Sequence, residues 1–234
     1  MALLRGILDV LFPPACQVCR TPGPDVLCRA CTDRFRLIRP PVCDRCGRPL
    51  RGPPDLLFTC VKCRGRRLGF AHARAAGVYE GTLRDAVHAL KFRGRMTLGA
   101  PLGRVMADAA GAAPALEGCD AIVPVPLHPS RRTERGFNQA EVLAQEVAAA
   151  LGLSLAPDAL KRVRATRAQS ELQLDERRTN VRGAFAAAAG GFQKVLLIDD
   201  VLSTGFTARE CARALRAAGA RKVVVLALAR TVLE

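Results

Sequence analysis

The sequence has no tryptophan, one tyrosine and only three histidines among its 234 residues. So few aromatic side chains leave no obvious platform for stacking bases. No apolar run approaches the roughly 20 residues that a membrane-spanning helix needs. No G-x-x-x-x-G-K-[ST] loop of a nucleoside triphosphatase occurs either. The sequence therefore excludes a Walker-type nucleotidase and predicts a protein without a membrane span.

The N-terminal segment lacks the features of a secretion signal. Arg5 and Asp9 interrupt its apolar residues, and Pro13-Pro14 stand where a signal would carry small residues for cleavage. We therefore expect a docking helix at the start of a cytoplasmic protein. The sequence does not indicate an oligomeric state.

Acidic residues are few compared with basic ones, and the formal net charge is +15. A strongly basic chain is expected to meet acidic ligands, because its field attracts them. The formal value counts every cysteine as neutral. Two zinc ions, each held by four thiolates and carrying about −2 per centre, would lower the charge to about +11.

Eight of the ten cysteines form four C-x-x-C pairs. The pairs are Cys16/Cys19, Cys28/Cys31, Cys43/Cys46 and Cys60/Cys63. A C-x-x-C turn places two thiolates on neighbouring corners of a tetrahedron, so two turns complete a four-cysteine zinc site. Pairing in sequence order predicts two structural zinc ions in tandem ribbons, and interleaved pairing also satisfies the spacing. A disulfide framework is disfavoured because nothing directs the chain to an oxidising compartment.

Beyond residue 70, short apolar strands alternate with amphipathic helices. We expect strands at 73–79, 194–199 and 222–229, a short buried strand that runs into a proline-stiffened loop within 120–129, and helices at 81–95, 138–152 and 205–220. This alternation predicts an α/β fold with a parallel sheet flanked by helices. The expected domains are residues 1–68, with the N-terminal helix and a double zinc ribbon, and residues 69–234.

The stretch "KVLLIDDVLSTGFT" carries the main functional signal. An apolar strand leads into Asp199 and Asp200, where ligands bind in parallel sheets. A magnesium strand of a nucleotidase would need the missing Walker loop. A response-regulator pocket would need a later phospho-acceptor aspartate, and Glu234 is the only acid after Glu210. An acid-ended core strand before an ordinary helix is the remaining structural alternative.

A phosphosugar site fits this stretch better. Backbone amides in the Ser-Thr-Gly turn and at the following helix N-terminus can bind a phosphate, and the hydroxyls of Ser203, Thr204 and Thr207 add donors. Gly205 lets the backbone approach the ligand closely. The two carboxylates are suited to accept hydrogen bonds from neighbouring ribose hydroxyls.

Four hydrophobic residues, two acids and T-G-x-T resemble the 5-phosphoribosyl-1-pyrophosphate (PRPP) signature of type I phosphoribosyltransferases. Three further stretches, "VPVPLHPSRRTERGFNQAEVLA", "ALKFRGR" and "RATRAQSELQLDERRTNVRGAF", behind a cysteine-rich module, resemble the ComF family. That family combines a double zinc ribbon with a phosphoribosyltransferase domain and is associated with DNA uptake in natural transformation. The resemblance covers nearly the whole chain.

The resemblance implies roles for particular residues. Asp199, Asp200 and Arg135 are the expected catalytic residues, with Arg135 facing the leaving pyrophosphate. The expected substrate-binding residues are Val125, Pro126, Val201, Leu202, Ser203, Thr204, Gly205, Phe206 and Thr207. Mg²⁺ would accompany PRPP. The polar stretch 162–182 is expected either to close over the substrate or to serve as a plain linker. Lys91, Arg93 and Arg95 are either phosphate contacts or solvated charges.

The resemblance supports PRPP binding more directly than turnover. The predicted function is therefore Mg-dependent phosphoribosyl transfer to an acceptor that the sequence does not reveal. Two alternatives stay open: a PRPP sensor without catalysis, and an adaptor that binds single-stranded DNA through the ribbons. Competence proteins are further expected partners.

Overall fold

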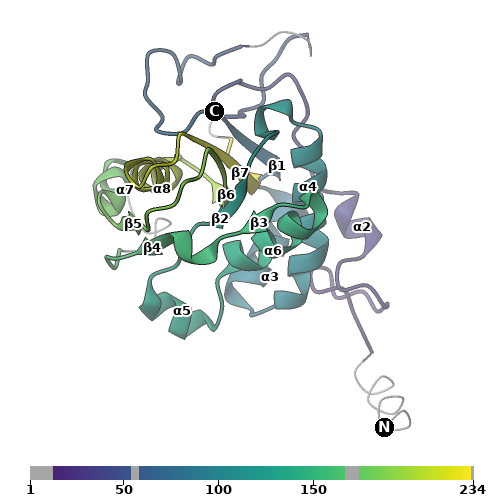
Figure 1. Cartoon of the computed structure of the whole chain (residues 1–234). Coiled ribbons are helices and arrows are strands. Elements are labelled where there is room, and N and C mark those ends of the chain that lie inside the picture. The colour runs from purple at the N-terminus through teal and green to yellow at the C-terminus, as the bar shows by residue number, and fades with distance from the viewer. Residues whose placement is uncertain (1–12, 54–57, 167–173, 233–234) are drawn as a thin grey trace.

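The computed structural model describes residues 13–53, 58–166 and 174–232. At its centre lies a parallel sheet with the strand order β1-β7-β6-β2-β3 (Figure 1). The strands are β1 (Ala73–Val78), β2 (Ala121–Pro124), β3 (Ser154–Leu155), β6 (Lys194–Leu202) and β7 (Lys222–Arg230). The sheet confirms the predicted α/β class.

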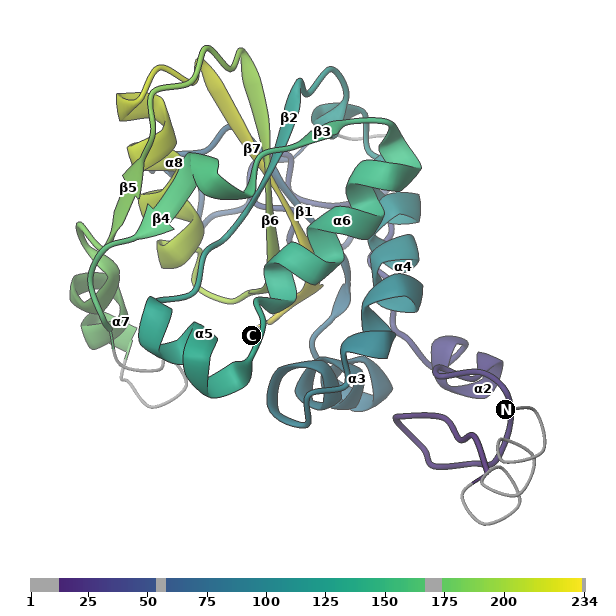
Figure 2. The same ribbon diagram turned by 60° about the horizontal axis from the view of Figure 1, so that its bottom comes forward.

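Helices cover both faces of the sheet, because alternate strand residues point to opposite sides. Leu196 and Ile198 pack in one core with helices α3 (Gly81–Phe92), α4 (Gly99–Gly111) and α6 (Gln139–Leu151). Val195 and Leu197 pack in a second core with α8 (Phe206–Ala217). Figure 2 shows α4 and α6 together on one side of the sheet and α8 on the other. The expected helices at 81–95, 138–152 and 205–220 are thus present, with somewhat different ends.

The remaining elements are short. They are α2 (Arg29–Thr32), α5 (Pro129–Arg135), α7 (Leu174–Val181), the 3-10 helices η1 (Met96–Leu98), η2 (Pro114–Leu116) and η3 (Pro157–Ala159), and the antiparallel pair β4 (Leu160–Arg162) and β5 (Phe185–Ala187). The polar stretch 162–182 therefore contains a helix, and its residues 167–173 lie outside the described part. The expected N-terminal helix at residues 1–12 also lies outside it.

The cysteine-rich segment packs directly on the sheet domain. Leu27 and Phe35 belong to the same buried core as Leu83 and Ala86 of α3. Further along, the amide of Ala73 at the start of β1 donates to the Arg45 carbonyl over 2.9 Å. The two parts share apolar packing and backbone hydrogen bonds, and the boundary between residues 68 and 69 stays a prediction. Within the described residues, none of the helices combines the length and apolarity needed to cross a bilayer.

Candidate functional site

The eight paired cysteines gather into two groups in sequence order. Cys16, Cys19, Cys28 and Cys31 form the first centre, and Cys43, Cys46, Cys60 and Cys63 form the second. Within each group the four sulfur atoms lie within 4.8 Å of one another. The structure therefore groups the ligands as sequential pairing predicted.

The sulfur spacing fits zinc. Tetrahedral Zn–S bonds of about 2.3 Å place sulfurs about 3.8 Å apart. Cys16 and Cys31 are separated by 3.8 Å, Cys19 and Cys28 by 3.6 Å, and Cys46 and Cys60 by 3.8 Å. A disulfide would need about 2.05 Å. Four thiolates complete a tetrahedron and leave no open position, so these centres are structural.

Several groups favour the thiolate form that a metal requires. The Thr21 hydroxyl lies 3.1 Å from the Cys19 sulfur and lowers the pKa of Cys19 to about 6. Backbone amides also point at sulfur, with Cys28 N 3.5 Å from Cys16 and Cys60 N 3.3 Å from Cys43. Cys211, in helix α8, belongs to neither group; it is fully buried and packs in the core of the sheet domain.

The predicted phosphosugar site lies where the connections of β2 and β6 diverge. After β2 the chain passes through α5 and α6 toward β3, and after β6 it passes through α8 to β7 on the other side. Because α6 and α8 cover opposite faces, a crevice for ligands is expected between the two strand ends. β2 pairs with β6 only as far as Ile198. The two acids therefore lie on the part of β6 beyond its pairing with β2.

Strand β6 is longer than the sequence suggested. Asp199, Val201 and Leu202 still pair with β7, so the acids lie inside the strand rather than at its last residue. The expected end at residue 199 was wrong because the longer β7 continues the ladder. We refer to residues 201–207 as the Thr-Gly loop, although its first two residues are extended.

Asp200 holds a buried ion pair with Lys91 at the end of α3. The Lys91 Nζ and Asp200 Oδ2 atoms are 2.7 Å apart, and the side chains are 18% and 5% exposed. Burial lowers the pKa of Lys91 to about 8, against the effect of Asp199. Of the two sequence-based alternatives for Lys91, the solvated charge is therefore wrong.

Asp199 stands beside this pair in a half-buried position. Its Oδ1 accepts a hydrogen bond of 2.9 Å from the Asp200 amide. Burial raises the pKa of Asp199 to about 6, while Lys91 and Arg162 act in the opposite direction. Arg162, at the end of β4, lies over the Phe185 ring at 5.5 Å from its centroid, and its buried Nε has no partner among the described residues. Shifted pKa values in two neighbouring groups are typical of functional sites.

The Thr-Gly loop turns tightly at Gly205. Gly205 has φ of 79°, in the left-handed region, and stands directly before the first turn of α8. The Thr204 hydroxyl is buried without a hydrogen-bond partner among the described residues. An unpaired buried hydroxyl is costly unless a ligand or water satisfies it. Ser203 and Thr207 are half-buried at the same place.

The loop after β2 forms the other side of the site. Val125 continues the ladder by donating to the Ile198 carbonyl over 2.8 Å, and Pro126 follows it. Asn138 caps α6 and donates its side-chain amide to the Val125 carbonyl over 3.1 Å. Asn138 therefore fixes the position of this loop relative to α6.

Arg135 reaches the same region from the end of α5. Its Nη1 donates to Gln139 Oε1 over 2.6 Å, and its guanidinium lies 5.3 Å from the Phe92 ring centroid. Burial lowers the pKa of Arg135, and Arg131 acts in the same direction. Arg132 instead pairs with Glu141 at 3.2 Å on the surface. His128 caps α5, because its Nδ1 accepts a hydrogen bond from the Ser130 amide.

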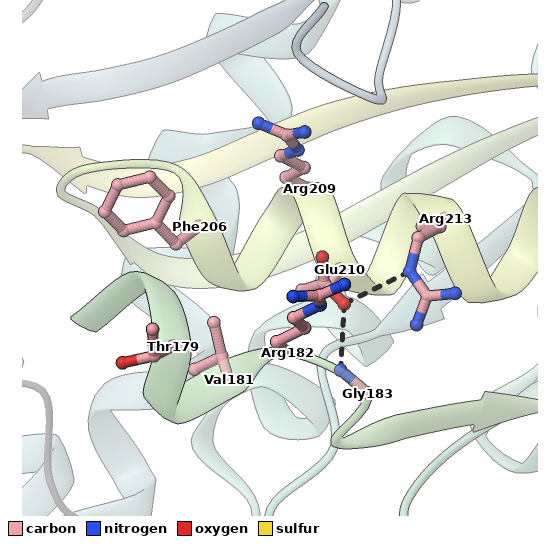
Figure 3. A pocket seen from close by; sticks show the side chains of 8 residues that line it. All are labelled: Thr179, Val181, Arg182, Gly183, Phe206, Arg209, Glu210 and Arg213. Atoms are coloured by element: carbon pink, nitrogen blue, oxygen red, sulfur yellow. Dashed lines mark hydrogen bonds and ion pairs between the residues drawn. The ribbon is translucent and has the colours of Figure 1, made fainter. Parts of the chain in front are cut away.

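A separate cavity of about 670 Å³ opens beside the Thr-Gly loop, between α7 and α8 (Figure 3). Phe206 lines it together with Arg182, Arg209 and Arg213. Glu210 accepts from the Gly183 amide at 3.0 Å and from Arg213 at 3.1 Å. Figure 3 shows Arg209 pointing away from these two contacts. The arginines do not converge on one point, so the cavity adds no defined ligand site.

Comparison with known proteins assigns both halves of the chain. Residues 7–66 match the model of the double zinc ribbon domain, and residues 138–231 match that of the phosphoribosyl transferase domain. The DNA utilization protein YhgH of Salmonella typhimurium is 33% identical over 94% of this chain and 98% of its own. Competence protein F of Haemophilus influenzae is 30% identical over 87% of this chain and 90% of its own.

Among solved structures, a glutamine PRPP amidotransferase from B. subtilis, complexed with ADP and GMP, aligns with a TM-score of 0.39. It is 21% identical and covers 56% of this chain and 26% of that chain. At this TM-score the similarity carries no argument about function. The two domain matches agree with the sheet and with the two cysteine centres described above.

Proposed function

Because the chain belongs to the ComF family, whose members join a double zinc ribbon to a phosphoribosyltransferase domain, we propose that it binds PRPP with Mg²⁺ and transfers the phosphoribosyl group. One observation carries the proposal: the two acids and the left-handed Gly205 loop follow each other directly beyond Ile198, the last residue of β6 that pairs with β2. The unpaired Thr204 hydroxyl supports a ligand at this point.

Each part of PRPP has a matching part of the site. The amides around Gly205 and at the start of α8 suit the 5′-phosphate, because a helix N-terminus attracts anions. Asp199 and Asp200 accept hydrogen bonds from the ribose hydroxyls. Arg135 and Lys91 supply positive charge for the pyrophosphate. Val125 and Pro126 line the loop along which the pyrophosphate would lie.

The transfer is a displacement at the anomeric carbon. The acceptor donates an electron pair to that carbon as the bond to the pyrophosphate oxygen breaks, and pyrophosphate leaves with those electrons. The protein's part is to hold the ribose and to stabilise the departing charge. Mg²⁺ would arrive with PRPP and neutralise the pyrophosphate. Among the described residues, no carboxylate cluster forms a metal site of its own.

Calorimetric titration with PRPP and Mg²⁺ tests the proposal. One site per chain is expected. Ribose 5-phosphate lacks the pyrophosphate that Arg135 would contact, so replacing PRPP by ribose 5-phosphate should cause a loss of binding. A screen for pyrophosphate release over candidate acceptors then separates an enzyme from a sensor. No binding of PRPP to a folded protein that contains both zinc ions would refute the proposal.

Lys91 gives the site a characteristic pH dependence. The pKa of Lys91 is lowered to about 8 by burial and that of Asp199 is raised to about 6 by burial. PRPP affinity should fall as the pH rises through about 8, because Lys91 loses its charge. It should also fall below about 6, where Asp199 and the ligand phosphates take up protons.

Lys91→Met should weaken PRPP binding about 10- to 150-fold, as expected for a lost hydrogen bond to a charged group. It should also remove the alkaline limb, which the ligand cannot produce because its phosphates are fully ionised there. Lys161→Met, at an exposed position of β4, is the matched control and should leave the profile unchanged. An alkaline limb that persists in Lys91→Met would assign it to another group.

A second candidate function is supported by the ribbon surface. Arg64, Arg66 and Arg67 are exposed beside the second zinc centre, and two relatives carry the names DNA utilization protein and competence protein. Binding of single-stranded DNA through these arginines should weaken with salt, with a log–log slope of about 0.7 per phosphate contact. Replacing all three by alanine should flatten this slope, measured by fluorescence anisotropy, without altering PRPP affinity. Loss of PRPP binding instead would make these arginines part of the phosphosugar site.

A further inference from the structure

Arg230 is a buried cation that has no carboxylate partner among the described residues. It ends strand β7, is 6% exposed, and takes part in none of the ion pairs among the described residues. Its Nη1 donates to the Cys46 carbonyl over 2.6 Å, and its Nε has no partner there. A buried charge is strongly unfavourable unless an opposite charge lies close by. Another negative group must therefore compensate Arg230.

The second zinc centre is that group. Arg230 contacts this centre through the Cys46 carbonyl; burial lowers the pKa of Arg230, and thiolates at Cys46, Cys63 and Cys60 would act in the opposite direction. The centre would carry about −2 with zinc bound by four thiolates. Arg74 lies nearby, with Nη1 3.0 Å from the Asp44 carbonyl; burial lowers its pKa, while the Asp44 carboxylate, Cys43 and Cys46 act in the opposite direction. Arg74 therefore has a carboxylate to compensate its charge, whereas Arg230 has none among the described residues.

The first zinc centre differs in this respect. Its sulfur atoms are approached by the Thr21 hydroxyl at 3.1 Å from Cys19 and by the Cys28 amide at 3.5 Å from Cys16, and among the described residues no hydrogen bond joins an arginine side chain to its cysteines. The two centres therefore form an internal comparison. One is charge-compensated by the sheet domain, and the other is held by its own ribbon.

Arg230 also adjoins the Thr-Gly loop. It is the register partner of Leu202, and Ala229 is the partner of Val201. The next residue, Thr231, donates its amide to the Leu202 carbonyl over 3.2 Å. The backbone that carries Arg230 therefore fixes the position of the first residues of the loop.

We propose that the second zinc centre is the counter-charge of Arg230 and so holds the Thr-Gly loop in its ligand-binding geometry. Arg230 is then a positioning residue that links metal occupancy at Cys43, Cys46, Cys60 and Cys63 to the loop. Loss of the second zinc loosens the loop, whereas loss of the first does not. The expected effect on PRPP binding rests on the proposed function, whereas the link between zinc occupancy and the loop conformation does not.

The test uses the full chain with both zinc ions. Arg230→Met keeps the length of the side chain and removes its charge. It should lower the zinc affinity of one of the two centres about 10- to 100-fold, as changes around metal ligands do. Competition with a chromogenic chelator measures this affinity. Arg230→Lys keeps the charge and should restore most of the zinc affinity. Wild-type zinc affinity in Arg230→Met would overturn the proposal.

Hydrogen exchange at residues 201–205 gives the second measurement. Cys63→Ser, in the second centre, should raise exchange there relative to strand β2, whereas Cys28→Ser, in the first, should not raise the loop above β2. Equal exchange in these two variants would also overturn the proposal. If Cys63→Ser fails to fold, the exchange of Arg230→Met against Arg230→Lys decides the same question. A wild-type chain that binds no PRPP while the zinc and exchange results hold would refute the proposed function alone.

Discussion

Gly205→Val should abolish measurable PRPP binding while leaving both zinc ions and the fold in place. The backbone at Gly205 has φ of 79°, and an added Cβ would come no closer than 3.9 Å to the rest of the chain. The protein has room for the side chain, so the damage comes from the backbone. A non-glycine residue in such a conformation costs about 1–3 kcal/mol, and a β-branched one is especially unfavourable. The loop should relax and turn its amides away from the phosphate.

Gly111→Val is the matched control for this prediction. Gly111 lies at the end of α4, has no positive φ, and has nothing within 4 Å of an added Cβ. It should bind PRPP like the wild type in calorimetry.

Asp200→Asn should act differently, because it keeps the phosphate contacts and loses the charged acceptor for ribose. An affinity loss of about 10- to 150-fold is expected. Unchanged affinity in both Gly205→Val and Asp200→Asn would place PRPP elsewhere.

Removing both zinc ions should unfold the sheet domain as well as the ribbons. Structural zinc contributes about 10–16 kcal/mol in zinc-finger peptides, which matches or exceeds the roughly 5–15 kcal/mol stability of a whole domain. Leu27 and Phe35 of the ribbon segment share a core with Leu83 of α3. Loss of the ribbon therefore exposes apolar surface of the sheet domain.

Metal analysis and thermal unfolding followed by circular dichroism measure this effect. The purified chain should contain two zinc equivalents and melt in one transition, and chelation should lower that transition or abolish it. Cys119→Ser lies outside both centres and should keep two equivalents. A two-step melt whose sheet transition is unaffected by chelation would show that the ribbons are an independent module. One zinc equivalent would contradict the two-centre arrangement.

The features that sequence reasoning found are local in the chain. The C-x-x-C pairs, the apolar strand before Asp199 and the Thr-Gly loop each occupy one short stretch, so spacing alone reveals them. Lys91 and Arg162 were harder to assign because they meet the acids only through the tertiary fold. Lys91 comes from α3 and Arg162 from β4, and neither belongs to a pattern that points to β6. The family resemblance drew attention to the stretch "ALKFRGR", which contains Lys91, but it could not show which of the two acids Lys91 contacts.

Helix α4 escaped prediction for a different reason. Gly99, Pro101 and Gly103 are typical of a loop, yet they open a helix of 13 residues. A Cβ at Gly99 would clash with Val142, and one at Gly103 would clash with Glu146. The glycines are therefore needed for the close packing of α4 on α6. The packing of α4 on α6 outweighs the low helix propensity of these residues, and a local sequence pattern does not reveal such packing.

The pairing of β1 with β7 sets an order for synthesis on the ribosome. In the described part of the chain, β1 has β7 as its only neighbour in the sheet, and β7 is the last strand to be made. The ligands of each zinc centre, by contrast, are complete as soon as the first 63 residues have emerged. Zinc binding can therefore precede completion of the sheet. Until β7 is made, the edge of β1 that pairs with it stays unpaired and can associate with other chains. Nascent chains short of zinc should consequently be the ones that chaperones and proteases intercept.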